Sequence, residues 1–358
     1  MAPAMRRFSM EAALSARGLD RLIVVGWMVA VAVVRSGTIT EADPYWQIRA
    51  GLENLDGMPL ARPDTWSWAP VDALFYPNSP AWNIILALGW RAGGFWGIFA
   101  LTAGAILAEL VIIGLLARSM GARPLPFLAV LIPITILAFP GLSPRATIVA
   151  QTLLLAAVGL AHWWSRRAGD HSAAVNAVVV GLAGFVLSLA GNWIHLSWLT
   201  WSLVTAGAWL VLWSLTPALG AARRVAMVAA GTLGLLLGMV WGPYGLGGWE
   251  RSAAVYAASA GLIAEWTTSL DTAPLALATA AVAALSAGTL AWAVRRTVHG
   301  HATDPTVRLA AVLALLALPT AVAGLWGSRF TYVALALIAP VAAAAATAAA
   351  ARLRACHA

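Results

Sequence analysis

Long apolar runs separated by short polar segments dominate this chain. A helix that crosses a bilayer needs about 20 mostly apolar residues. Ten runs approach that length, at residues 21–38, 95–116, 125–141, 146–164, 175–191, 196–215, 225–241, 273–294, 307–326 and 330–350. The pattern therefore predicts an all-α polytopic membrane protein with about ten transmembrane helices.

The composition agrees with this pattern and excludes several classes of protein. Hydrophobic residues make up 61% of the chain and charged residues 10%, and the mean hydropathy is +0.82. A soluble domain carries roughly 25% charged residues, so a soluble enzyme, a disordered protein and a nucleic-acid-binding domain are excluded. The single cysteine, Cys356, excludes an internal disulfide and a cysteine-based metal site.

The placement of arginine predicts the orientation of the chain in the membrane. With a cytoplasmic N-terminus, the closely spaced arginines between the apolar runs fall on the cytoplasmic side, as the positive-inside rule requires. They are Arg118 and Arg123, Arg166 and Arg167, Arg223 and Arg224, Arg295 and Arg296, and Arg352 and Arg354. We expect a cytoplasmic segment at 1–20, a transmembrane domain at 21–350 and a cytoplasmic tail at 351–358.

The basic residues are all arginine, and alanine and glycine are abundant. This bias is typical of a GC-rich bacterial genome, and we therefore expect a bacterial inner (cytoplasmic) membrane. Most carboxylates and tryptophans then fall on the outer side. We therefore expect the active face outside and both termini in the cytoplasm.

Two long segments on that outer side, 36–94 and 242–272, are candidates for function, because loops on a rigid scaffold often carry chemistry. The first contains Glu41 and Asp43, and then Tyr45, Trp46, Ile48 and Leu52 at helical spacing. This spacing predicts a helix lying in the membrane interface, with the two carboxylates near the surface. A second interfacial helix is expected before Gly93-Gly94. The alternative for the carboxylates is a solvated loop or a helix N-cap, which Asp43-Pro44 also fits.

The ordered motifs of the chain resemble the GT-C superfamily of integral-membrane glycosyltransferases, which use polyprenyl-phosphate-linked sugars. Glu41-Ala42-Asp43 is similar to the modified D-x-D motif of their first outer loop. One bacterial branch has further motifs matched here by Tyr45, Trp46, Gln47, Ile48 and Gly51, by Gly57, Pro59, Asp64, Trp66 and Ser67, and by Asn78 and Trp82. Weaker matches follow at Ser143-Pro144-Arg145, Asn192-Trp193-Ile194-His195, Gly242-Pro243-Tyr244-Gly245, Glu265-Trp266 and Arg329. Three positions depart from that branch: Glu41 replaces an aspartate, Gln47 replaces a histidine, and a proline precedes Arg145 instead of following it.

The resemblance implies a GT-C-like fold and an enzyme of the EC 2.4 class. Such an enzyme moves a sugar from a polyprenyl phosphate to an envelope glycan, lipid or protein acceptor, with inversion. Asp43 or Glu41 would be the base that takes the acceptor proton. The other carboxylate would orient the acceptor or hold a divalent cation, Mg²⁺ or Mn²⁺.

Positive charge is needed for the phosphate leaving group, and arginine supplies it as a planar fork of donors. The candidates are Arg145, Arg329, Arg251 and His195. For the arginines the alternative is snorkelling to the interface, and for His195 a structural role at a helix end. The candidate substrate-binding residues are Tyr45, Trp46, Gln47, Asp64, Asn78, Asn192, Tyr244 and Glu265.

Two other functions fit part of the pattern. A catalytically silent partner of an envelope-assembly complex would explain the short chain and the altered motif. A transporter or flippase for lipid-linked sugars is less well supported, because there is no convincing internal repeat and the polar residues gather on one face.

Glu109 lies within the second span, where a carboxylate is costly and is usually functional or paired.

Overall fold

The computed structural model describes residues 2–38, 42–66, 74–216, 219–259, 267–301 and 304–356. Of the residues that the structure describes, 82% are helical. The long α-helices are α1 (Ala2–Ser36), α4 (Phe95–Ser119), α5 (Pro124–Leu137), α6 (Ala146–Ser165), α7 (Ala173–Ile194), α8 (Trp198–Ser214), α9 (Ala221–Val240), α11 (Ala273–Arg296), α12 (Pro305–Ala323) and α13 (Arg329–Cys356). Three further α-helices, α2 (Asp43–Leu55), α3 (Pro80–Gly93) and α10 (Gly248–Ser259), lie in the segments predicted as long outer loops.

The remaining elements are short. They are the strands β1 (Arg62–Pro63) and β2 (Leu74–Phe75), which pair antiparallel, and the short helices η1 (Ala168–Asp170), η2 (Gly245–Gly247), η4 (Ser269–Asp271) and η5 (Thr297–His301).

The prediction of a helical membrane protein is confirmed at the level of class. Seven helices of the described chain are long and apolar enough to cross a membrane: α4, α6, α7, α9, α11 with η5, α12 and α13. Each of the ten predicted spans falls largely on a helix, but α5 has 14 residues and α8 has 17. The count of ten transmembrane helices therefore stays a prediction.

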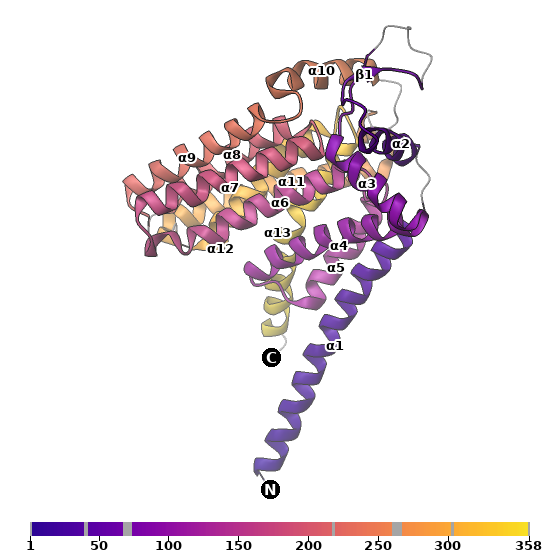
Figure 1. Ribbon diagram of the computed structural model, residues 1–358. Helices are drawn as coiled ribbons and strands as arrows, with labels where there is room; N and C mark the ends of the chain where they lie inside the picture. Colours follow the sequence, from indigo (N-terminus) through magenta and orange to yellow (C-terminus); the bar gives the residue numbers. More distant parts are fainter. Residues whose placement is uncertain are drawn as a thin grey trace.

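The helices form two packed groups, which are joined by α13 and by direct packing of α4 against α6. Figure 1 shows α6, α7, α8, α9 and α12 running side by side, with α1, α4 and α5 in a second group. Helix α13 packs against α12 of the first group, against α11, and against α4 and α5 of the second group. Its residues 331–341 are buried, so α13 forms the centre of the domain.

The closest helix pair, α7 with α9, depends on glycine. A Cβ on Gly234 would lie 2.1 Å from the carbonyl oxygen of Gly181, and one on Gly238 would lie 2.6 Å from that of Phe185. The backbones of α7 and α9 therefore come into direct contact at these glycines of α9. Small residues allow such close approach between helices in a membrane, where dispersion contacts replace the hydrophobic drive.

Helices α2 and α3 pack against each other at one end of the domain, near the start of α4. Both occur where the apolar spacing predicted short helices. Helix α2 starts at Asp43, with Ala42 as its N-cap and Pro44 in its first turn. The N-cap interpretation of Asp43 is therefore wrong, and its carboxylate is available for other contacts.

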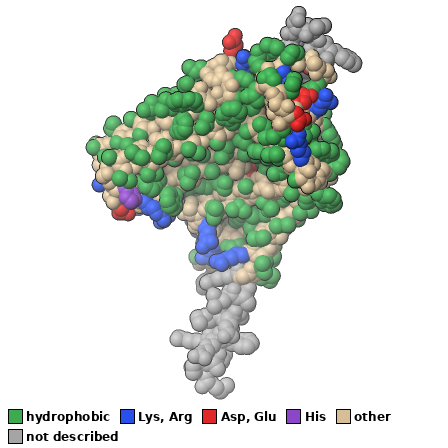
Figure 2. Space-filling view, in the orientation of Figure 1, with side chains coloured by type: hydrophobic (Ala, Val, Ile, Leu, Met, Phe, Trp, Pro, Cys, Tyr) green, Lys and Arg blue, Asp and Glu red, His purple; other side chains and the backbone are tan. Residues whose placement is uncertain are grey.

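Charged side chains lie toward the ends of the domain. Figure 2 shows hydrophobic side chains over most of the visible face, with arginines along the lower and left edges and mixed charges near α2. We give the name arginine end to the C-terminal ends of α4, α6, α11 and α13 and the start of α9, where the paired arginines occur: Arg118, Arg166, Arg296, Arg352 and Arg223. The opposite end carries α2, α3 and α10.

Candidate functional site

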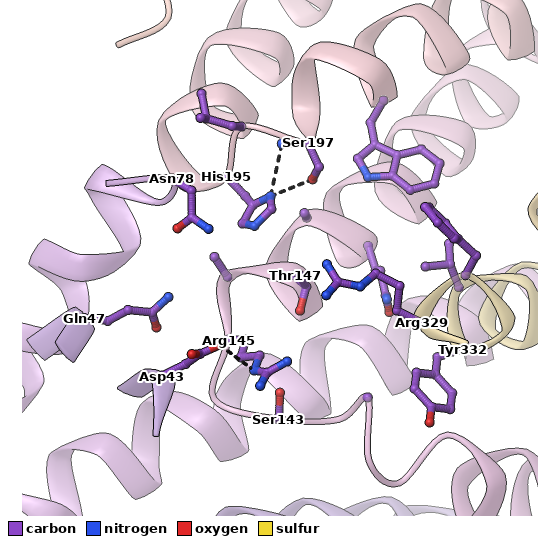
Figure 3. A pocket seen from close by; sticks show the side chains of 18 of the residues that line it. Asp43, Gln47, Asn78, Ser143, Arg145, Thr147, His195, Ser197, Arg329 and Tyr332 are labelled. Carbon is purple, nitrogen blue, oxygen red and sulfur yellow. Dashed lines mark hydrogen bonds and ion pairs between the residues drawn. The ribbon is translucent and has the colours of Figure 1, made fainter. Parts of the chain in front are cut away.

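A cavity of about 340 Å³ lies at the end of the domain that carries α2. Its volume falls within the range of roughly 300–1,000 Å³ typical of small-molecule sites. The polar residues that line it are Asp43, Gln47, Asn78, Ser143, Arg145, Thr147, Gln151, His195, Ser197, Ser252, Arg329 and Tyr332. Figure 3 shows many of these side chains arranged around an open centre, although they come from widely separated parts of the chain.

Of the two carboxylates in the Glu41-Ala42-Asp43 motif, the structure describes Asp43. Its side chain lines this cavity. Its Oδ2 is 3.0 Å from Nε of Arg145, and its Oδ1 accepts a hydrogen bond of 3.1 Å from Nε1 of Trp46. Gln47 follows Asp43 by one helical turn, so both side chains project from the same face of α2. These contacts hold the carboxylate in one orientation at the cavity wall, with 39% of the side chain exposed.

Arg145 is positioned by the segment before α6. It is the N-cap of α6, with an extended backbone (ψ 154°). Nε1 of Trp82, a buried residue of α3, donates to the carbonyl oxygen of Pro144 at 3.3 Å. The motif tryptophan therefore fixes the segment that carries the arginine.

His195 lies in the short connection between α7 and α8. This connection is tied to the first loop, because the Leu196 N–H donates to the carbonyl oxygen of Asn78 at 2.9 Å. The backbone N–H of Ser197 donates to Nδ1 of His195 at 3.1 Å, and the Ser197 hydroxyl lies 2.7 Å from the same nitrogen. A ring nitrogen that accepts a hydrogen bond carries no proton, so the neutral ring carries its proton on Nε2.

The surroundings keep this ring neutral. Burial lowers the pKa of His195 to about 4, and the positive charge of Arg329 adds to the effect. The ring edge opposite Ser197 faces the centre of the cavity (Figure 3). His195 therefore offers the cavity one N–H donor and no charge.

A second guanidinium enters the cavity from the last helix. Arg329 is the first residue of α13 and reaches toward Thr147 of α6, and Tyr332 follows one turn later (Figure 3). Arg145 and Arg329 thus bring two permanent positive charges to one cavity from distant parts of the sequence. Arginine stays charged in such partly buried places, which suits it to binding a phosphate group.

Several predicted substrate-binding residues lie outside the cavity lining. Tyr45 is 53% exposed on α2. Asp64 accepts a hydrogen bond of 2.9 Å from the backbone N–H of Trp66 and so shapes the turn directly after β1. Asn192 is buried in α7, where its side-chain amide donates to the carbonyl oxygen of Ser188 at 2.7 Å.

Tyr244 and Arg251 also serve the surrounding structure instead of lining the cavity. The Tyr244 hydroxyl donates to the carbonyl oxygen of Pro77 at 2.8 Å, and burial raises the pKa of Tyr244 to about 12, so it remains a donor. The Arg251 guanidinium lies 3.5 Å from the centre of the Tyr76 ring. These contacts hold α10 against the first loop. Ser252, which follows Arg251 in α10, lines the cavity.

Two predicted residues, Glu41 and Glu265, lie outside the described residues. Of the proposed pair of cation ligands, only Asp43 is therefore placed. Within the described chain, no group of three or more His, Cys, Asp or Glu side chains is arranged to hold a metal ion. The role of Mg²⁺ or Mn²⁺ stays a prediction.

Part of the cavity wall comes from residues outside the sequence motifs. Thr147 and Gln151 line it from α6, and Trp201 lines it from α8. One signal was available: Thr147 and Gln151 are polar residues four positions apart in an apolar span, directly after Arg145. That spacing places them on one helix face.

Together the cavity residues can bind an anion and accept a proton beside it. Two guanidinium groups suit a phosphate ester, the carboxylate of Asp43 can accept a proton, and the amides of Gln47 and Asn78 suit hydroxyl groups. Comparison of the chain with models of known protein families, with curated proteins and with solved structures finds no match in any of the three.

Proposed function

We propose that the protein is a membrane glycosyltransferase of the GT-C type. It would move a sugar from a polyprenyl phosphate to an acceptor hydroxyl of the cell envelope. The observation that carries the proposal is the meeting of Asp43 with Arg145, Arg329 and neutral His195 around one cavity. The order of motifs along the chain supports the same function.

The cavity residues divide the reaction between them. Arg145 and Arg329 hold the phosphate of the donor, and the Asp43 carboxylate takes the proton of the acceptor hydroxyl. The acceptor oxygen forms a bond to the anomeric carbon while the bond from that carbon to the phosphate oxygen breaks. Polyprenyl phosphate leaves, and attack from the side opposite the phosphate inverts the anomeric centre.

Neutral His195 has a different task from the arginines. Its Nε2–H donates a hydrogen bond to a phosphate or sugar oxygen, and the ring neither removes a proton nor adds charge. Gln47, Asn78 and Thr147 present amide and hydroxyl groups that fit the remaining hydroxyls of the sugar.

The proposed orientation places the cavity on the outer side of the inner membrane and the arginine end in the cytoplasm. Cys356 provides a test, because it is the single cysteine of the chain and is exposed at the end of α13. In intact cells, a membrane-impermeant maleimide should leave Cys356 unlabelled, and permeabilisation should allow labelling. Labelling in intact cells would reverse the orientation.

The activity test uses purified full-length protein with a panel of labelled polyprenyl-phosphate sugars and an envelope extract as acceptor. The variants are Asp43→Asn and Glu41→Gln. The matched control is Asp56→Asn, because Asp56 is exposed and pairs with Arg91 at the far end of α2. Wild type and control should release polyprenyl phosphate, and Asp43→Asn should not.

The outcomes separate the candidate functions. Loss of turnover in Glu41→Gln alone would assign the base to Glu41. Absence of turnover with every donor, in protein that melts cooperatively, would favour the silent partner of an envelope-assembly complex. Movement of an intact donor across a vesicle membrane without transfer would favour the flippase.

A further inference from the structure

A second, much smaller cavity lies next to the first, toward the middle of the membrane domain. Its volume is about 20 Å³. Gly141, Gln151 and Tyr332 line both cavities, so the two share a wall. A methyl group on Gly141 would lie 2.7 Å from the ring of Tyr332, which shows how tightly this wall is packed.

Glu109 lines the smaller cavity and takes no part in the proposed reaction. It lies in the middle of α4, an otherwise apolar stretch from residue 95 to 117, and is 2% exposed. Within the described residues its Oε2 is buried with no hydrogen-bond partner. A polar atom without a partner in this environment costs free energy, so the position needs an explanation.

The neighbours of Glu109 favour its neutral form. Helices α1, α3, α6 and α13 pack against α4. Among the residues lining the small cavity, the titratable ones are Glu109 and Tyr332, and none is an arginine or a histidine. A carboxylate without a cation at membrane depth is strongly disfavoured, so the side chain carries a proton.

The small cavity is large enough for one water molecule. A site of about 10–15 Å³ or more holds a water if polar groups surround it. Glu109 and Gln151 supply such groups from α4 and α6. The Thr135 hydroxyl is already engaged, because it accepts from Trp27 at 3.1 Å and donates to the carbonyl oxygens of α5.

We propose that Glu109 is an internal proton site connected to the large cavity. Its protonated carboxyl shares one water with the side chain of Gln151, and the proton exchanges with the large cavity past Gln151. The site takes water and protons only, because its volume excludes larger ligands. It is a property of the membrane domain that does not depend on glycosyl transfer.

Infrared spectroscopy of the full-length protein tests this site without any substrate. At neutral pH, wild type should show the C=O stretch of a protonated carboxylic acid, and Glu109→Gln should lack it. After transfer to D₂O the band should shift to lower frequency, because the proton exchanges, and rapid mixing measures the rate of that shift. Glu109→Asp should retain a displaced band, and it replaces Glu109→Gln if the latter does not fold.

The role of Gln151 has its own matched pair of variants. Gln151→Met keeps the length of the side chain and removes its polar atoms, so it should slow the D₂O shift at least tenfold. Gln47→Met, at a glutamine that lines only the large cavity, should leave the exchange rate unchanged. The proposal is overturned if folded wild type lacks the band, if the band does not shift in D₂O, or if Gln151→Met exchanges as fast as wild type.

Discussion

Helix α2 carries two carboxylates of similar chemistry on different parts of its surface, and their surroundings differ. Asp43, in the first turn, faces the cavity and pairs with Arg145. Glu53, in the last part of the helix, faces the hairpin of β1 and β2. There its Oε2 lies 3.1 Å from Arg62, and its Oε1 accepts from Arg49 at 2.9 Å and from Trp66 at 3.0 Å.

The two carboxylates differ in how many side chains they contact and in which part of the chain supplies those side chains. Glu53 is held by three side chains of its own loop, and Arg62 also stacks near the rings of Trp66 and Phe75. Such a network fastens the hairpin to α2 and leaves little room for a ligand. Asp43 instead borders open space beside residues of α6, α7–α8 and α13. The direction of the side chain therefore decides the role of each carboxylate: Glu53 stabilises the loop, and Asp43 is available for a reaction in the cavity.

The largest expected effect comes from removing the cavity carboxylate. Asp43→Asn should lower turnover by about 10²–10⁴-fold, because general-base catalysis contributes on that order, with little change in melting temperature. Release of labelled polyprenyl phosphate measures it, with Asp56→Asn as control. Equal turnover in Asp43→Asn and wild type would show that Asp43 is not the base. Asp43 and Glu53 would then not differ in function.

Removing the partner of Asp43 should have the next largest effect. Arg145→Gln should lower turnover by roughly 10²-fold, because it deletes a charge-assisted contact to the donor phosphate and the ion pair that orients Asp43. Initial rates over a range of donor concentrations separate weaker donor binding from slower transfer. Arg91→Gln, which breaks an exposed pair on α3, should behave as wild type. A comparable loss in both variants would point to general damage.

The burial of His195 at the cavity can be measured through the pH dependence of the stability of the protein. Its pKa is about 4 in the folded protein, below the ordinary value of 6.5, so the unfolded chain binds more protons between those values. Stability from this group is full above pH 6.5 and falls toward pH 4, by at most about 3 kcal/mol. Thermal melts across this window should show a smaller slope for His195→Gln than for wild type.

The control for this experiment is His299→Gln, which changes an exposed histidine of η5 and should retain the wild-type slope. An identical slope in His195→Gln and wild type would mean that His195 titrates alike in the folded and unfolded chains. Burial would then not lower the pKa of His195, and the ring would become charged in the cavity at mildly acidic pH.

The smallest effect is expected on the scaffold side of α2. Glu53→Gln should lower the free energy of unfolding by about 1–2 kcal/mol, because it weakens hydrogen bonds to the charged Arg49 and Arg62. Turnover below the melting temperature should change less than threefold. Glu250→Gln, on the exposed surface of α10, is the control. A large loss of turnover without loss of stability would place Glu53 in the reaction.

The sequence predicted the local elements well, and the cavity only in part. The apolar spacing of Tyr45, Trp46, Ile48 and Leu52 predicted a helix in the first loop, and α2 lies there. Asp43, Trp46, Gln47, Asn78, Arg145, His195 and Arg329 were named as site residues and all line the cavity. Asp64, Asn192, Tyr244 and Arg251 were named on the same grounds, but their partners lie elsewhere, because a motif records spacing along the chain and not the direction of a side chain.

Composition and the period of the apolar residues by themselves determined that this protein is helical and suited to a bilayer. They act through local physics: an apolar helix satisfies its own backbone in lipid. Only the tertiary structure decided that Arg145 pairs with Asp43 and that Arg329 lines the same cavity. It also decided that Ser197 sets the tautomer of His195 and that Glu109 and Gln151 line one small cavity. Those outcomes depend on how helices distant in sequence pack, and that packing is governed by close contacts such as the glycines between α7 and α9.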